Sequence, residues 1–204
     1  MSDLTIDVWA DFLCPWCYLG SHSVKEVAER THAPVSWRAY ELRPAGAPMF
    51  DAAKLSMIQR GWPMLRERAR AMGLDTSVEH PALTASSHAA HVAQAAVSAL
   101  LPEGDAAQRF HDAVYRAHWV EGRDIGDPEV LVELLATVGL DGDRARAALS
   151  DPIYEERVLA DEREARERGI RGVPQVVMNG RLLPAGALPT EALLEIAERV
   201  KQLA

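Results

Sequence analysis

The chain has 204 residues, of which 48% are apolar and 25% are charged, and its formal net charge is −8. This composition is typical of a globular protein with a sizeable core, and it is too apolar for a disordered chain. The acidic balance argues against a nucleic-acid partner, and no stretch reaches the roughly 18 to 20 apolar residues that a membrane span requires. We therefore expect neither nucleic acid nor membrane among its partners.

The first predicted element is a strand over residues 4–10, because apolar and polar residues alternate there. No basic segment leads into an apolar run at the N-terminus, so no secretory signal peptide is visible and we expect a cytoplasmic protein. A helix is predicted from Cys14 through Pro15 to about Arg30, and residues 35–42 alternate again. This strand–helix–strand unit predicts two parallel strands with a right-handed crossover, the beginning of an α/β sheet.

Between about residues 48 and 168 the sequence has helical periodicity and almost no strand pattern. Asp127 and Asp151 each precede a proline, the arrangement of an N-cap before a first-turn proline, and Gly139 and Gly169 stand where C-terminal glycines are favoured. The predicted helices are Ala53 to Met72, Thr84 to Leu100, Ala106 to Val120, Pro128 to Val138, Asp143 to Leu149 and Pro152 to Arg168.

The pattern changes after Gly169. Residues 173–178 and 181–183 are apolar and flank Asn179-Gly180, the strongest short-range signal of a two-residue hairpin turn. The last two strands are therefore predicted to be antiparallel. Residues 189–203 close the chain with an amphipathic helix.

Only two cysteines occur, Cys14 and Cys17. A pair this close in sequence cannot join distant parts of a fold as a structural disulfide does, so we expect a chemical role. Because the pair opens a predicted helix, free N–H groups and the helix dipole should lower the pKa of Cys14. Cys14 is then the nucleophile and Cys17, one turn further in, the resolving thiol. Between them, Pro15 removes an N–H and Trp16 offers a flat apolar surface.

A Cys-x-x-Cys pair also begins many zinc sites. Here no second cysteine pair follows, and no two histidines have the spacing of paired zinc ligands. His88 and His91 share one face of a predicted helix, which is more typical of core or surface histidines than of metal ligands. We therefore expect no metal and no tightly bound cofactor.

Two further positions are unusual. Pro174 stands at the start of a predicted strand, where it has to lie outside the interior hydrogen bonding of a sheet, and an ordinary trans proline opening an edge strand is the alternative explanation. Asp11 lies three residues before Cys14, where its carboxylate could cap the turn or relay protons to the dithiol. Capping is the role that we favour.

Two sequence runs resemble a known family. Residues 11–20 (DFLCPWCYLG) and residues 172–175 (GVPQ) are similar to the DsbA-like thioredoxin-fold oxidoreductases, specifically their FrnE-type branch. The resemblance spans nearly the whole chain and is loosest over residues 48–120. It implies an α/β, thioredoxin-like fold with a large all-helical insertion.

The resemblance also implies a domain organisation and a substrate site. A thioredoxin-like domain would comprise residues 1–46 and 169–204, and a helical domain residues 47–168. In this superfamily the proline equivalent to Pro174 is cis, and the residue before it, here Val173, faces the active cysteine and binds substrate as an added strand.

The same wider family includes 2-hydroxychromene-2-carboxylate isomerase and kappa-class glutathione transferase, which bind glutathione and carry serine where this chain has Cys14. The cysteine favours dithiol chemistry. We therefore interpret the chain as a thiol-disulfide oxidoreductase, a disulfide reductase or isomerase, with Pro15, Trp16, Val173 and Pro174 around the substrate.

Two alternatives stay open at this point. One is an isomerase or transferase of small molecules that uses glutathione or another thiol, and the other is a redox-switched binding or holdase module. Expected partners are disulfide-containing proteins or small-molecule thiols, with glutathione a candidate co-substrate. A homodimer is compatible with the amphipathic surface.

Overall fold

The computed structural model describes residues 3–44, 47, 51–76 and 86–203. The chain forms two compact units, Met1–Leu42 with Leu159–Ala204, and Arg43–Val158. We call them the sheet unit and the helical unit. The domain boundaries expected from the sequence, after residues 46 and 168, stay predictions.

The sheet unit contains four strands in the order β2-β1-β3-β4. Strand β1 (Ile6–Ala10) pairs in parallel with β2 (Val35–Ala39) and antiparallel with β3 (Gln175–Met178). Strand β4 (Arg181–Leu182) completes a hairpin with β3. The strand–helix–strand beginning and the late hairpin predicted from the sequence are therefore confirmed.

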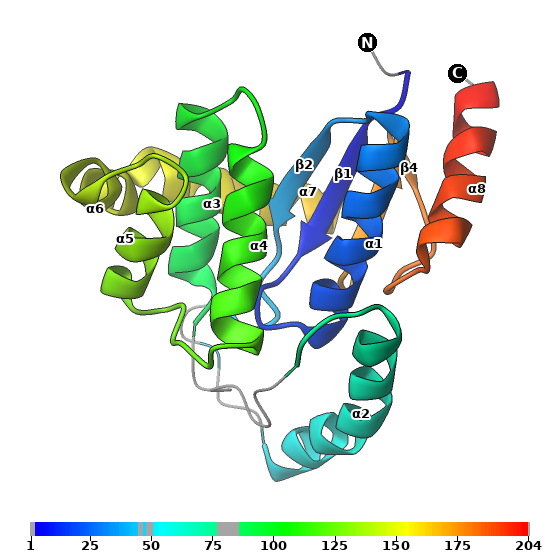
Figure 1. The fold of residues 1–204 in the computed structure, drawn as a ribbon, viewed down its shortest axis with the longest axis horizontal. Helices are drawn as coiled ribbons and strands as arrows, with labels where there is room; N and C mark the ends of the chain where they lie inside the picture. Colours follow the sequence, from blue (N-terminus) through cyan, green and yellow to red (C-terminus); the bar gives the residue numbers. More distant parts are fainter. Residues whose placement is uncertain (1–2, 45–46, 48–50, 77–85, 204) are drawn as a thin grey trace. The chain divides into compact units, whose positions relative to one another are not determined.

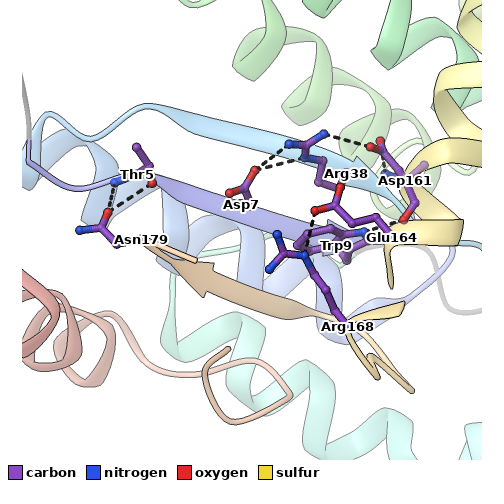
Figure 2. Close-up of polar contacts among 9 residues, drawn as sticks. Thr5, Asp7, Trp9, Arg38, Asp161, Glu164, Arg168 and Asn179 are labelled. Carbon is purple, nitrogen blue, oxygen red and sulfur yellow. Dashed lines mark hydrogen bonds and ion pairs between the residues drawn. The ribbon is translucent and has the colours of Figure 1, made fainter. Parts of the chain in front are cut away.

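The turn of this hairpin follows the predicted chemistry. Asn179 and Gly180 have φ angles of 45° and 77°, the left-handed conformation that a tight two-residue hairpin requires at both positions. The side-chain oxygen of Asn179 also accepts a hydrogen bond of 2.8 Å from the backbone N–H of Thr5 (Figure 2). The turn is thereby tied to the residues that lead into β1.

Helices cover both faces of the sheet (Figure 1). Helix α1 (Pro15–Thr31) and helix α8 (Thr190–Gln202) contact each other. Helix α7 (Pro152–Glu167), whose residues from Leu159 onward belong to the sheet unit, lies on the face opposite α1. Because side chains alternate along a strand, Trp9 of β1 faces α7 and packs with the cluster Ala165, Ile170 and Val177.

A partly buried polar network holds α7 to the sheet (Figure 2). The indole N–H of Trp9 donates a 2.9 Å hydrogen bond to the backbone carbonyl of Asp161. The guanidinium of Arg38 on β2 donates to the carboxylates of both Asp7 and Asp161, each at 3.1 Å. The second Asp161 oxygen accepts from the backbone N–H of Ala39 at 3.2 Å. Strands β1 and β2 are thus both hydrogen-bonded to a single residue of α7, Asp161.

The helical unit contains five complete helices in its described part and the first residues of α7. Its core is apolar and aromatic, with Phe110, Tyr115, Trp119, Leu131 and Leu135 almost fully buried. The helices are α2 (Ala52–Ala71), α3 (His88–Leu100), α4 (Ala106–Trp119), α5 (Pro128–Ala136) and α6 (Gly142–Ser150). The beginning of the helix predicted from Thr84 lies outside the described residues.

The predicted helix ends are also found. The carboxylate of Asp127 accepts from the backbone N–H of Glu129 at 2.9 Å, and that of Asp151 accepts from Ile153 at 3.0 Å. Gly139 has a φ of 101°, the left-handed conformation that glycine adopts after a helix. None of the described helices is long and apolar enough to cross a membrane.

Candidate active site

The loop between β1 and α1 presents the two cysteines. Cys14 is the N-cap residue of α1, with extended backbone angles of −89° and 114°, and Pro15 occupies the first helical turn, where its missing N–H costs nothing. The carbonyl of Cys14 accepts from the backbone N–H groups of Cys17 at 3.0 Å and Tyr18 at 3.2 Å. The sequence thus places both sulfur atoms at the N-terminus of one helix.

Cys14 carries the more acidic of the two sulfurs. Both cysteines are thiols and both are buried. A hydrogen bond from the side chain of Cys17 lowers the pKa of Cys14, and backbone N–H groups of Cys17 and Trp16 lower it further, against the opposing effects of burial and of the Asp11 charge. The net direction is downward, as the position at a helix N-terminus predicts.

Cys17 behaves in the opposite way. Burial raises its pKa well above the ordinary value, and the hydrogen bond and negative charge of Cys14 add to that effect. The pair therefore separates into one thiol that ionises readily and one that keeps its proton. This difference in pKa suits a nucleophilic thiol, Cys14, and a resolving thiol, Cys17.

A second loop completes the site from the far end of the sequence. The Val173–Pro174 peptide bond is cis, and the carbonyl of Val173 lies 3.7 Å from the Cys14 sulfur. The side chain of Val173 packs against the cluster around Trp9, and the carbonyl of Pro174 accepts from the N–H of Gly186 at 2.9 Å. The backbone beside Cys14 is thus anchored on both sides.

Asp11 is fully buried at the end of β1. One carboxylate oxygen accepts from the backbone N–H of Leu13 at 3.0 Å and the other from that of Leu42 at 2.7 Å. The first of these bonds caps the turn that leads to Cys14. The second ties the same turn to the segment after β2, and it explains why β2 ends at Ala39 although the sequence pattern continues to residue 42.

Gly20 is a feature of the site for which the sequence suggested no role. A Cβ atom at this position of α1 would lie 2.9 Å from Cγ and 3.4 Å from Cβ of Pro174. Real contacts are not that short, so only glycine allows α1 this close to the cis-proline loop. Its signal in the sequence is a glycine inside a helix, where glycine is unfavourable by about 1 kcal/mol relative to alanine.

The remaining predicted residues differ in their exposure. Pro15, Trp16 and Val173 are partly exposed, whereas Pro174 is buried. Within the described residues no group of three or more His, Cys, Asp and Glu side chains could hold a metal ion. The arrangement provides an acidic thiol, a second thiol beneath it and an adjacent backbone carbonyl, which together are suited to thiol–disulfide exchange.

Comparisons with known proteins identify the family. The family model for the DSBA-like thioredoxin domain matches residues 5–197. The chain is 26% identical over 188 residues to the uncharacterized protein YwbO of Bacillus subtilis, covering 89% of this chain and 90% of the relative. It is 25% identical over 182 residues to a 2-hydroxychromene-2-carboxylate isomerase of Sphingobium xenophagum, covering 87% and 90%.

A solved structure extends the comparison to three dimensions. The crystal structure of a probable DsbA oxidoreductase from Streptomyces coelicolor superposes with a TM-score of 0.82 at 30% identity, covering 98% of this chain and 91% of that one. Sequence family and three-dimensional fold therefore agree over almost the full length of the chain. The protein belongs to the DSBA-like thioredoxin domain family.

Proposed function

We propose that this protein is a dithiol–disulfide oxidoreductase that works through Cys14 and Cys17. The observation that carries the proposal is the pairing of the two sulfurs: the buried Cys17 thiol donates to Cys14 and lowers its pKa, while its own pKa is raised. A thiol that ionises readily and a neighbouring thiol that keeps its proton are the two species that disulfide reduction needs.

The reaction proceeds in two exchanges. The Cys14 thiolate attacks one sulfur of a substrate disulfide, the substrate S–S bond breaks, and the other substrate sulfur leaves as a thiolate. Cys17 then gives up its proton to that leaving thiolate and attacks the Cys14 sulfur. This step forms the Cys14–Cys17 disulfide and releases the second substrate thiol. Two electrons pass from the protein to the substrate, and an external dithiol or two monothiols return them.

The substrate is held beside Cys14 by backbone and apolar contacts. The Val173 carbonyl, 3.7 Å from the Cys14 sulfur, is placed to meet an extended peptide as an added strand, and Pro174 holds that carbonyl in position. Pro15 and Trp16, both partly exposed, would contact the substrate from the opposite side. Disulfide-containing polypeptides and small disulfides both suit such a site.

The direction of electron flow follows from the surroundings in which the protein works. In a reducing cytoplasm, where we place it, the pair would rest as the dithiol, so reduction or isomerisation is favoured over net oxidation. No tightly bound cofactor is needed, because glutathione or another low-molecular-weight thiol could restore the dithiol.

The decisive experiment is insulin reduction driven by dithiothreitol. We expect turbidity with the wild type and none above background with Cys14→Ser, while Cys17→Ser should lose turnover but trap a mixed disulfide with the substrate. A redox titration against glutathione would give the midpoint potential and hence the direction. Equal turbidity with wild type and Cys14→Ser would overturn the proposal.

The 25% identity to 2-hydroxychromene-2-carboxylate isomerase favours one second candidate, a thiol-dependent isomerase of small molecules. In that case an added thiol such as glutathione would do the chemistry, and Cys17 would be dispensable. Assaying Cys17→Ser with glutathione and an isomerase substrate separates the two functions. Retained isomerase turnover without insulin reduction would favour the isomerase, and loss of all turnover would favour the dithiol mechanism.

A further inference from the structure

Arg171 is an exposed arginine next to the Val173–Pro174 loop of the proposed active site. It precedes Val173, whose carbonyl is 3.7 Å from the Cys14 sulfur, by only two residues. Because consecutive Cα atoms are about 3.8 Å apart, the two Cα atoms are separated by at most roughly 7 Å. The Arg171 side chain is exposed, so its guanidinium can meet a molecule that is bound against Val173.

Two arginines that precede Arg171 in the sequence are already engaged with carboxylates. Arg168 pairs with Glu164 at 2.8 Å and lies over the Trp9 ring, with 5.6 Å between the guanidinium carbon and the ring centroid. Arg166 pairs with Glu162 at 3.8 Å. Among the residues that the structure describes, Arg171 has no such carboxylate partner. Arg171 is therefore a cation near Val173 in the sequence that remains available to a ligand.

The charge of Arg171 is not one of the influences that shift the pKa of the Cys14 thiol. The groups that shift the pKa of Cys14 are Cys17, Trp16 and Asp11, together with burial. Arg171 is not among them. Its charge would therefore act on the rest of the substrate, and it would do so in a chain whose net charge of −8 otherwise repels anions. An exposed charge at the rim of a site mainly changes the association rate and its salt dependence.

We propose that Arg171 is a specificity-determining residue that favours disulfides carrying a carboxylate near the sulfur, over neutral and cationic disulfides. This inference rests on the proposed oxidoreductase function and names its substrate class. Oxidised glutathione and acidic segments of polypeptide both present this chemistry. The exchange steps themselves are unchanged, because Arg171 neither gains nor loses a bond or a proton.

The test uses the full-length protein, one variant and one matched control. Arg171→Gln removes the charge beside Val173. Arg181→Gln removes another exposed arginine, at the opposite end of the hairpin, where Arg181 pairs with Met178. The probes are oxidised glutathione, which is anionic, 2-hydroxyethyl disulfide, which is neutral, and cystamine, which is cationic. For each, kcat/KM is measured at low ionic strength and again at about 1 M salt.

We expect Arg171→Gln to lower kcat/KM for oxidised glutathione by roughly three- to tenfold at low salt, to leave the neutral disulfide unchanged and to raise cystamine turnover. These changes in kcat/KM among the three disulfides should disappear at high salt, and Arg181→Gln should not produce them at either salt concentration. An equal loss on all three probes, or the same selectivity change in Arg181→Gln, would overturn the assignment of Arg171.

A second measurement does not depend on turnover. Iodoacetate and iodoacetamide alkylate the same thiolate, are similar in size and differ by one negative charge. Arg171→Gln should slow the reaction of Cys14 with iodoacetate several-fold relative to iodoacetamide at low salt. If the ratio of the two rates does not change, the inference fails even when insulin is reduced. If the ratio changes and no disulfide is reduced, Arg171 selects anions and the proposed oxidoreductase function fails.

Discussion

The two units of this protein use polar residues in different ways. The sheet unit buries carboxylates, among them Asp11 and Asp161, which accept hydrogen bonds from residues far away in sequence, Leu42 and Arg38 respectively. In the described part of the helical unit the buried polar side chains are uncharged types or histidines, such as Gln94, His91 and His111. Its ion pairs, such as Arg146 with Glu129, lie at the surface.

This difference has an energetic consequence. A buried carboxylate costs several kcal/mol to desolvate and is retained only when its hydrogen bonds are made, so it fixes the geometry of its neighbours. Surface pairs contribute little, and a helical core held by apolar packing tolerates small adjustments. Substitution of a polar residue should therefore lower the free energy of unfolding more in the sheet unit than in the helical unit.

The largest expected effect comes from removing a buried carboxylate in the sheet unit. Asp161→Ala would leave the Arg38 guanidinium bonded to the carboxylate of Asp7 and would remove the acceptor of the Ala39 N–H. We expect a loss of about 2–4 kcal/mol in the free energy of unfolding, measured with chemical denaturant.

The control for this change lies in the helical unit. Glu129→Ala removes a carboxylate that accepts two 2.9 Å hydrogen bonds from Arg146, but the pair is more than half exposed. Its cost should stay below about 1 kcal/mol. Equal losses for the two variants would mean that burial does not separate the units in the way we describe.

The second effect compares two helical glycines. Gly20→Ala would push the Pro174 ring and, with it, the Val173 carbonyl away from Cys14. Gly61→Ala in α2 meets nothing within 4 Å. Because alanine favours helices, Gly61→Ala should stabilise by about 0.5–1 kcal/mol and leave turnover unchanged.

For Gly20→Ala we expect roughly a tenfold loss of kcat/KM in insulin reduction, since an ångström of misplacement costs at least that much. The rate at which iodoacetamide alkylates Cys14 reports whether the surroundings of this thiol have been displaced. A variant that is only less stable would stay folded at moderate temperature and would alkylate at the wild-type rate. Full activity in Gly20→Ala would show that the close approach of α1 to Pro174 is not needed.

The third effect is a response of the helical unit to acid. His111 of α4 is buried, its ring meets that of Tyr115 edge-on at 4.9 Å, and burial, with His91 nearby, lowers its pKa well below the ordinary value. The unfolded chain binds a proton near pH 6.5 that the folded chain does not bind. Stability is therefore constant above that pH and falls below it, by about 1 kcal/mol per pH unit.

His111→Gln should flatten this dependence, measured by denaturant unfolding from neutral pH to about pH 5 and by amide hydrogen exchange in α4. The matched control is His22→Gln in the sheet unit, a partly exposed histidine that pairs with Glu26 at 3.4 Å. If the two variants lost acid sensitivity equally, the buried histidine would not be its source.

Local signals in the sequence account for the elements that were predicted correctly. Asp127 before Pro128 and the Asn179-Gly180 turn act over two or three residues, so their effect can be read without the fold. Strand β2 was predicted too long because the alternating pattern does not show that the Leu42 N–H donates to Asp11 instead of pairing in the sheet.

The remaining parts of the site depend on contacts between distant residues. Arg38 and Asp161 are 123 positions apart, and nothing local to either residue indicates the other. The space taken by Pro174 beside Gly20 is likewise set by the packing of a loop on a helix. The dithiol could be found from its spacing, but the geometry around it required the structure.

The smallest expected effect concerns the one site residue for which the sequence left two roles open. Asp11→Asn keeps the shape of the side chain, but it removes the charge and leaves one oxygen acceptor for the two backbone N–H groups of Leu13 and Leu42. That charge raises the pKa of both cysteines. The variant should therefore lower the pKa of Cys14 and speed its alkylation by iodoacetamide at mildly acid pH, by roughly two- to threefold.

The two roles then separate on turnover. If Asp11 only caps the turn, insulin reduction by Asp11→Asn should follow the small change in thiolate content and rise or stay level. If its carboxylate also takes the proton that Cys17 must lose, turnover should fall although Cys14 alkylates faster. The mixed disulfide with substrate should then accumulate in Asp11→Asn even though Cys17 is present. Since both carboxylate oxygens already accept backbone N–H groups, we expect the first outcome.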